Sequence, residues 1–208
     1  YSFSHGIEHA CATGLIRNAC DLRDWIAALL GHGSGGIDAS LVAASWRAET
    51  AGNDDRLAEL ATLADAWRAT AETALESRAQ GHAFLTAIAA GWPAPRLDAY
   101  RQLLARIERQ PAYACAVGVG TAIAGIPLAV TVLAFVHAFA AGLVSAGVRL
   151  IPWGQSAALR VTADLEACLR ATAAGAIATP PEAITACALA AEWTSARHET
   201  QDVRLFRS

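Results

Sequence analysis

The sequence predicts an all-α protein, a single-domain helical bundle that spans residues 1–208 and has a central pair of apolar helices. Three observations favour this fold class. Alanine and leucine outnumber valine, isoleucine and threonine, and no segment alternates polar and apolar residues as a half-buried strand would. Several segments repeat apolar residues at helical spacing, and capping residues and helix breakers separate these segments from one another.

A glycine-rich stretch separates the first two predicted helices. Asp21 is expected to cap a helix that ends at Leu30, because a carboxylate accepts hydrogen bonds from the free N–H groups of a first turn. Residues 31–36 contain four glycines and are expected to form a loop. This stretch lacks the lysine of a phosphate-binding loop and no strand precedes it, so we interpret it as a connector. Asp38 or Ser40 would begin the next helix.

The longest predicted helix begins where Asn53 or Asp54 caps it. Apolar residues then recur at helical spacing and continue past Leu75; the first of them are Leu57, Leu60, Leu63, Ala64 and Trp67. Glycine and proline residues at 91–95 end this helix, and another helix is expected over 97–109.

Residues 112–148 contain no charged side chain. A run of this length also fits a membrane hairpin. Five glycines and one proline interrupt it, and alanine supplies much of its apolar character, which favours a buried helix pair at the centre of a soluble bundle. We therefore expect no membrane association. The residues expected to be buried are Val119, Ile123, Leu128, Val132, Phe135 and Phe139.

The amino-acid composition and the net charge indicate which kinds of binding partner to expect. The net charge is −3 and the pI is about 6.1, whereas nucleic-acid binding needs a clustered basic field. Only 17% of residues are charged and 54% are apolar, while an ordinary domain has about 25% charged residues, so we expect a partner to cover part of the surface. The five cysteines form no CxxC pair, which predicts a reducing compartment rather than a disulfide framework. No signal peptide is visible.

One short motif suggests metal chemistry. His5 and His9 with Glu8 spell H-x-x-E-H, and on a helix the two histidines would lie one turn apart and could share a zinc ion. Gly6 weakens such a helix, and no third ligand is evident. We therefore expect no metal site, no bound cofactor and no catalytic residue, and we interpret the motif as a helix with two partly exposed histidines.

Two further clusters of polar residues have a functional and a simpler interpretation. Glu72, Glu76, Arg78 and His82 fall on one predicted helix, and we interpret them as a solvated face with local ion pairs. The segment 197–208 contains three arginines around Leu205 and Phe206. It fits either a frayed polar tail or an interaction tail, because an aromatic residue between arginines is typical of interface hot spots. Its few apolar groups predict loose docking in the isolated protein.

Four stretches in this chain together resemble the UreF family of urease accessory proteins. They are YSFSHGIE at 1–8, ESRAQG at 76–81, VSAGVRLIPWGQ at 144–155, and the tail RHETQ…RLFRS within 197–208. They occur in the family's order and span nearly the whole chain. Two departures stand out: Trp153 replaces the usual leucine, and an aspartate-valine pair replaces a tyrosine-serine pair in the tail.

This resemblance implies a cytoplasmic, homodimeric, non-enzymatic protein that binds UreD (UreH in some organisms). That complex would recruit the GTPase UreG and dock on the urease apoprotein, and the complex as a whole would handle nickel. The resemblance leaves a second role open, in which the chain activates GTP hydrolysis by UreG. The residues that it assigns to partner binding are Tyr1, His5, Glu8, Arg149, Gln155, Arg197, His198, Glu199, Arg204, Leu205, Phe206 and Arg207.

Overall fold

The computed structural model describes residues 3–183 and 185–206, and over these residues the protein is all-α, as predicted. No strand occurs in this part of the chain. The elements are α1 (Ile7–Ala12), α2 (Ala19–His32), α3 (Ser34–Thr50), α4 (Asp54–Ala66), α5 (Ala71–Gly91), α6 (Pro95–Arg106), α7 (Tyr113–Ile123), α8 (Leu128–Leu150), α9 (Gln155–Asp164), α10 (Glu166–Ala178), the 3-10 turn η1 (Pro181–Ala183) and α11 (Leu189–His198).

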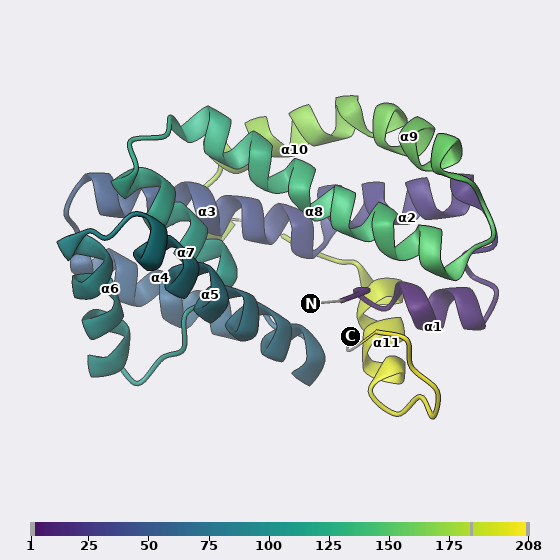
Figure 1. Cartoon of the computed structure of the whole chain (residues 1–208), viewed down its shortest axis with the longest axis horizontal. Coiled ribbons are helices and arrows are strands. Elements are labelled where there is room, and N and C mark those ends of the chain that lie inside the picture. Colours follow the sequence, from purple (N-terminus) through teal and green to yellow (C-terminus); the bar gives the residue numbers. More distant parts are fainter. Residues whose placement is uncertain (1–2, 184, 207–208) are drawn as a thin grey trace.

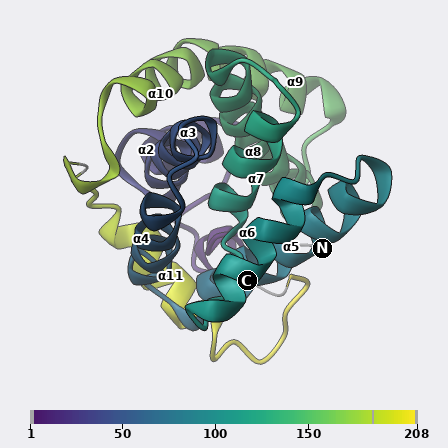
Figure 2. The ribbon, with the colours of Figure 1, turned by 90° about the vertical axis from the view of Figure 1, so that its left-hand side faces the viewer.

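Helix α3 lies at the centre of the bundle, where it contacts α2, α4, α7, α8 and α10. Leu41 and Val42 on this helix are fully buried. Helices α4, α5, α6 and α7 gather at one end of the molecule, while α1 and α11 meet at the other end beneath α2 and α8 (Figure 1). Viewed from the end formed by α4 to α7, α8 and α10 lie on one side of α3 and α11 lies on the other (Figure 2). The core is therefore built around a helix that the sequence did not single out.

The predicted glycine loop is wrong, because the stretch 31–36 is helical except at Gly33. Helix α2 continues to His32, and α3 begins at Ser34 with a bend of 41° between the two helices. Packing of both helices in the core outweighs the low helix propensity of glycine, which is about 1 kcal/mol per residue. The cap of α2 also differs: the Asn18 side chain accepts hydrogen bonds from the N–H groups of Cys20 and Asp21.

The predicted longest helix is two helices. Asn53 caps α4 as expected, through a hydrogen bond of 2.9 Å from the Arg56 N–H. The break comes at Thr70, whose hydroxyl accepts from the Thr73 N–H at 3.2 Å while the Thr73 hydroxyl accepts from the Thr70 N–H at 3.3 Å. This reciprocal capping pair starts α5 as a new helix, although the apolar residues on either side follow a helical pattern.

The uncharged segment forms α7 and α8, but the two helices do not pair at the centre. Helix α7 packs mainly on α3 and α5, whereas α8 packs on α3 and α10 and contacts α7 only weakly. Of the residues predicted to be buried, Val119, Val132 and Phe135 are buried. Partial exposure is found instead for Ile123, Leu128 and Phe139. Ile123 and Leu128 lie at the end of α7 and the start of α8, and Phe139 borders a cavity between α5 and α8. One face of α8 also has no partner among the described residues.

By length and composition, α8 is apolar enough to cross a membrane, and the bent pair α2–α3 passes the same criterion. Only 39% of the most apolar 18-residue window of α8 is buried. Large apolar side chains on and next to its outer face are Ile126 (37% exposed), Val130 (55%) and Leu133 (38%). A core helix of a soluble protein can have the same length and composition, and the burial of the other face of α8 is compatible with that case.

Candidate functional site: a clasp between the two ends of the chain

The two ends of the described chain meet where α1 packs on α11 (Figure 1). The chain enters α1 through a turn in which His5 and Gly6 have positive φ angles of 48° and 77°. A side chain at position 6 would place its Cβ 2.5 Å from the Thr194 hydroxyl oxygen, so only glycine permits this turn to lie directly on α11. Gly6, which weakens the predicted helix that would contain His5 and His9, therefore allows the chain to pack closely on α11.

The carboxylate of Glu8 binds the C-terminal segment. It accepts hydrogen bonds from the N–H of Leu205 at 2.6 Å and the N–H of Phe206 at 2.9 Å, and its Oε2 lies 3.0 Å from Nε2 of the His198 ring. Burial raises the pKa of Glu8, but these donors outweigh it, and the net pKa lies below its ordinary value of 4.5. Glu8 is therefore ionised, and it is only 7% exposed.

His198, the last residue of α11, is fully buried between two carboxylates. Its Nδ1 lies 2.8 Å from Glu72 Oε2 on α5, and its Nε2 contacts Glu8 on α1. The second oxygen of Glu72 pairs with Arg204 Nη1 at 2.9 Å. We call Glu8, Glu72, His198 and Arg204 the terminal clasp, because they join α1, α5, α11 and the C-terminal segment.

Glu199 adds a second link between α11 and α5. Its Oε1 accepts from the N–H groups of Ala71 at 2.8 Å and Glu72 at 3.4 Å, in the first turn of α5. A carboxylate at this position satisfies N–H groups that have no partner within the helix and also faces the positive end of the helix dipole. The clasp is thus attached to the beginning of α5 both by side chains and through the backbone.

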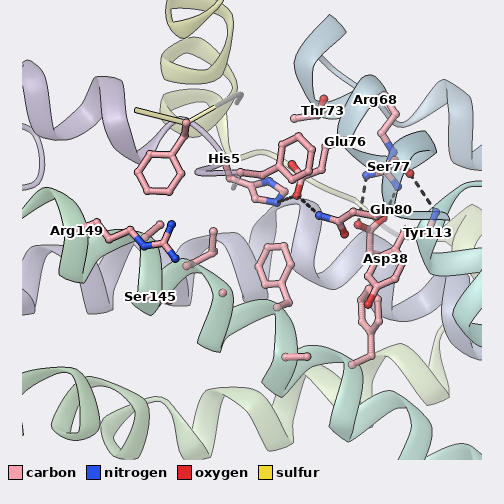
Figure 3. A pocket seen from close by; sticks show the side chains of 18 residues that line it. His5, Asp38, Arg68, Thr73, Glu76, Ser77, Gln80, Tyr113, Ser145 and Arg149 are labelled. Atoms are coloured by element: carbon pink, nitrogen blue, oxygen red, sulfur yellow. Dashed lines mark hydrogen bonds and ion pairs between the residues drawn. The ribbon is translucent and has the colours of Figure 1, made fainter. Parts of the chain in front are cut away.

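A cavity of about 250 Å³ lies beside the clasp, between α5 and α8 (Figure 3). Glu76 projects into it, one turn after Glu72, and its Oε1 contacts His5 Nε2 at 3.2 Å and Gln80 Nε2 at 2.9 Å. Burial lowers the pKa of His5, but the charge of Glu76 and its hydrogen bond more than compensate, so the net pKa is raised. Phe206 lines the same cavity, with the Arg149 guanidinium 5.8 Å from the centre of its ring.

The deeper wall of this cavity contains an ion pair between Arg68 and Asp38. The guanidinium binds both carboxylate oxygens, with Nη1 3.2 Å from Oδ2, and both side chains are largely buried. Such a planar, two-point pair fixes the orientation of both groups. The polar walls of the cavity are therefore already occupied by interactions within the protein.

The histidine motif does not have the geometry of a zinc site. Helix α1 begins at Ile7, so the helical spacing assumed for His5 and His9 is wrong. The His5 ring packs on Phe139 at 5.1 Å between ring centres, whereas His9 packs on Trp193 at 5.7 Å and contacts Gln201 at 3.2 Å. Within residues 3–183 and 185–206, no three His, Cys, Asp or Glu residues form a group that could hold a metal ion.

The predicted site residues fall into three groups. His5, Glu8, His198, Glu199, Arg204 and Phe206 come together at the clasp and its cavity, and Arg149 lies above Phe206. Exposed positions are occupied by Gln155 at the start of α9, Arg197 at the end of α11 and Leu205, which is 61% exposed. Tyr1 and Arg207 lie outside the described residues.

Two expectations about these segments are wrong. The described part of the tail is firmly docked rather than loose, since Phe206 is only 5% exposed and its N–H is bonded to Glu8. Glu72 and Glu76 are each 7% exposed and belong to the site, although we interpreted them as part of a solvated face. Their spacing of four residues, which places two carboxylates on one helix face, is the signal that could have identified them.

Comparison of the sequence with known proteins identifies the family of this chain. A sequence model of the family described as UreF matches residues 16–166. The chain is 43% identical to the urease accessory protein UreF of Granulibacter bethesdensis, over all of this chain and 87% of that protein.

The chain belongs to the UreF family.

Other UreF proteins support the same assignment across the full length. The chain is 41% identical to UreF of Bradyrhizobium diazoefficiens and 40% identical to UreF of Magnetococcus marinus, with all of this chain covered and 85% and 90% of the relatives. The family model ends at residue 166, but these alignments include α11 and the C-terminal segment. Membership in the UreF family implies a non-catalytic, accessory role in urease maturation.

Proposed function

We propose that this protein is a cytoplasmic scaffold that binds UreD (UreH in some organisms), recruits the GTPase UreG and docks the assembly on the urease apoprotein for nickel insertion. Membership in the UreF family over the whole chain is the observation that carries this proposal. In this role the protein needs no catalytic residue and no cofactor of its own, because nickel is handled by the complex.

The C-terminal segment is the surface that we assign to UreD. Residues Val203 (82% exposed) and Leu205 (61%) project from it, and Leu75 (55%) lies nearby on α5. These side chains surround Arg204 and a buried Phe206, so apolar and cationic groups are presented together. Interfaces are typically anchored by such residues.

Co-purification with UreD and UreG tests this assignment. Leu205→Glu should weaken capture of UreD at least roughly tenfold while leaving the melting temperature unchanged, because the side chain is exposed and a buried interfacial charge costs more than about 1.4 kcal/mol. The matched control is Leu159→Glu on α9, since Leu159 is an equally exposed leucine (71%) away from the clasp. Equal capture of UreD by both variants would contradict the proposed surface.

The homodimer implied by the family resemblance has a candidate surface on α8. The outer face of this helix carries Val130 and Leu133, and no residue between 112 and 148 is charged. Two copies could therefore face each other without bringing like charges together, and the alanines on this face would permit close helix packing.

A second role, as an activator of GTP hydrolysis by UreG, is favoured by the exposure of Arg197. In the described part of the chain no hydrogen bond or ion pair involves its guanidinium, whereas Arg204 is paired with Glu72 and Arg149 lies over Phe206. Arg207 is the fourth candidate arginine. Single-turnover GTP hydrolysis by UreG with this protein, and with Arg197→Ala, separates the two roles: a scaffold leaves the rate unchanged, and an activator raises it through Arg197.

A further inference from the structure

The hydrogen bonds of His198 require two protons on its ring. Each ring nitrogen lies within 3.0 Å of a carboxylate oxygen, Nδ1 against Glu72 and Nε2 against Glu8. An ionised carboxylate only accepts hydrogen bonds, and a neutral imidazole has a single N–H to donate. Both contacts can therefore be hydrogen bonds only if His198 is an imidazolium ion or if one carboxyl group carries a proton.

The surroundings place the proton on the histidine. Glu8 accepts two backbone N–H groups besides its contact to His198, which stabilises its ionised form, and Glu72 forms an ion pair with the Arg204 guanidinium. With His198 charged, the clasp contains two negative and two positive groups and is neutral overall. A buried cluster of charges persists only when it is paired and hydrogen-bonded in this way.

We propose that docking of the C-terminal segment requires the doubly protonated His198, so that loss of one ring proton releases residues 199–206 and the surface that they form. After proton loss, one ring nitrogen presents a lone pair to a carboxylate at 2.8–3.0 Å. Among the four residues of the clasp, Arg204 is then the remaining cation for the two buried carboxylates. The inference rests on the proposed function only in treating this segment as a partner surface.

Other titratable groups near the clasp do not have this property. Glu199, directly after α11, is bonded to the backbone of α5, and His9 on α1 contacts the neutral side chain of Gln201. His5, just before α1, contacts Glu76 through Nε2, and Glu76 lies one turn after Glu72 on α5. A neutral His5 with its proton on Nε2 would keep its hydrogen bond to Glu76. A neutral His198 would instead lose its hydrogen bond either to Glu8 or to Glu72.

The experiment uses the isolated full chain and needs no partner. Nitrogen-15 NMR of the histidine rings reports the protonation of both His198 nitrogens, and hydrogen exchange reports protection of the Leu205 and Phe206 amides that bond to Glu8. Both are followed from roughly pH 6 to pH 10, a range in which histidine can lose its charge. We expect protection, corrected for intrinsic exchange, to fall about tenfold per pH unit once His198 loses a proton, because docking is linked to one proton.

Two variants separate a proton requirement from a merely structural role. In Glu72→Gln the amide can donate to a neutral imidazole and still accept from Arg204, so protection should persist to higher pH than in the unmodified protein. The control His5→Gln removes the neighbouring histidine and should leave the pH dependence of protection unchanged.

A singly protonated His198 in the docked state, or protection that does not change with pH, would overturn the proposal. So would a Glu72→Gln variant that docks and loses protection at the same pH as the unmodified protein. If that variant fails to dock, the ring protonation of the unmodified protein still decides. None of these measurements involves UreD. A negative result here would therefore not contradict the proposed scaffold function, and a failed co-purification with UreD would not contradict the proton requirement of His198.

Discussion

Glu8 lies seven residues after the start of the sequence, yet its carboxylate binds a segment near residue 205. Its three contacts are to Leu205, Phe206 and His198; those to Phe206 and His198 are buried, and the one to Leu205 is partly buried. A buried carboxylate in this position is costly unless every lone pair is used, so single changes here should have large effects.

Glu8→Gln is predicted to lower the free energy of unfolding by about 1.5–3 kcal/mol, the usual contribution of a hydrogen bond to a charged group. The amide can replace some contacts but removes the negative charge beside His198. Urea denaturation measures the loss, and tryptic cleavage at Arg204 should become faster. Glu192→Gln, an exposed glutamate on α11, is the control and should change neither. Equal effects of both variants would show that Glu8 does not hold the segment.

The shifted pKa values of Glu8 and His5 predict how the stability of the protein depends on pH. The pKa of Glu8 is lowered below 4.5, so its contribution is present above that pH and is lost as the pH falls through the lower, folded-state pKa. The pKa of His5 is raised above 6.5, so its contribution is full below that pH and is lost as the pH rises through the folded-state pKa.

Melting temperatures measured against pH should therefore fall on both sides of an optimum. Glu8→Gln should flatten the acid side, and His5→Gln should flatten the alkaline side. If Glu8→Gln leaves the acid side of the curve unchanged, Glu8 does not cause the loss of stability at low pH. If His5→Gln leaves the alkaline side unchanged, His5 does not cause the loss at high pH.

At the scale of elements, α5 depends on Gly81. A Cβ atom at this position would lie 2.0 Å from the carbonyl oxygen of Pro111, a backbone atom that cannot move without displacing the start of α7. The helix carries Glu72 and Glu76, so the close approach of α5 and α7 also positions the clasp and its cavity.

Gly81→Ala is predicted to destabilise the protein by about 1–3 kcal/mol, the usual cost of overpacking a well-packed site. Gly175→Ala in α10 is the matched control, because no atom outside its own helix lies within 4 Å of the added carbon. This control should be neutral or stabilising by up to about 1 kcal/mol, since alanine favours the helix. Guanidinium denaturation compares them, and the same sign for both changes would refute the steric argument.

At the scale of the whole molecule, the fold class and several boundaries followed from sequence, because capping and periodicity are local signals. The cap at Asn53 is an example. The break at Thr70 was missed because the apolar pattern continues through it, and only a four-residue capping motif interrupts the helix. The exposed face of α8 was missed because hydropathy does not distinguish a face that packs within the chain from one that is free for a partner.

The clasp could be predicted only in part. Resemblance to the UreF family assigned His198, Arg204 and Glu8 to partner binding, but it did not predict that they contact one another through Glu72, and composition predicted a loosely docked tail. The stabilising contacts join residues 126 to 198 positions apart, such as Glu72 and His198, and no local pattern specifies such pairings. Glu72 was assigned to a solvated face for the same reason, because its partners His198 and Arg204 lie on other elements.

The exposed face of α8 predicts self-association. Val130→Asp combined with Leu133→Asp should raise the dimer dissociation constant at least roughly tenfold, because each aspartate would be buried without a counter-charge. Sedimentation velocity over a concentration series measures this, with Leu159→Asp as the control. A mutant that associates as tightly as the unmodified protein would exclude this face as the dimer surface.

The link between Glu8 and the segment around residue 205 also has a consequence for biosynthesis. The ribosome makes α1 early, but its carboxylate acquires its donors only after residues 198–206 have emerged. A polypeptide that terminates before residue 198 would contain the sequence of α3 and of the helices packed on it, yet Glu8 and Glu72 would lack their contacts to His198 and Arg204. The partner surface that we propose would therefore be absent from prematurely terminated chains, and assembly with its proposed partners would favour translation products that extend through Phe206.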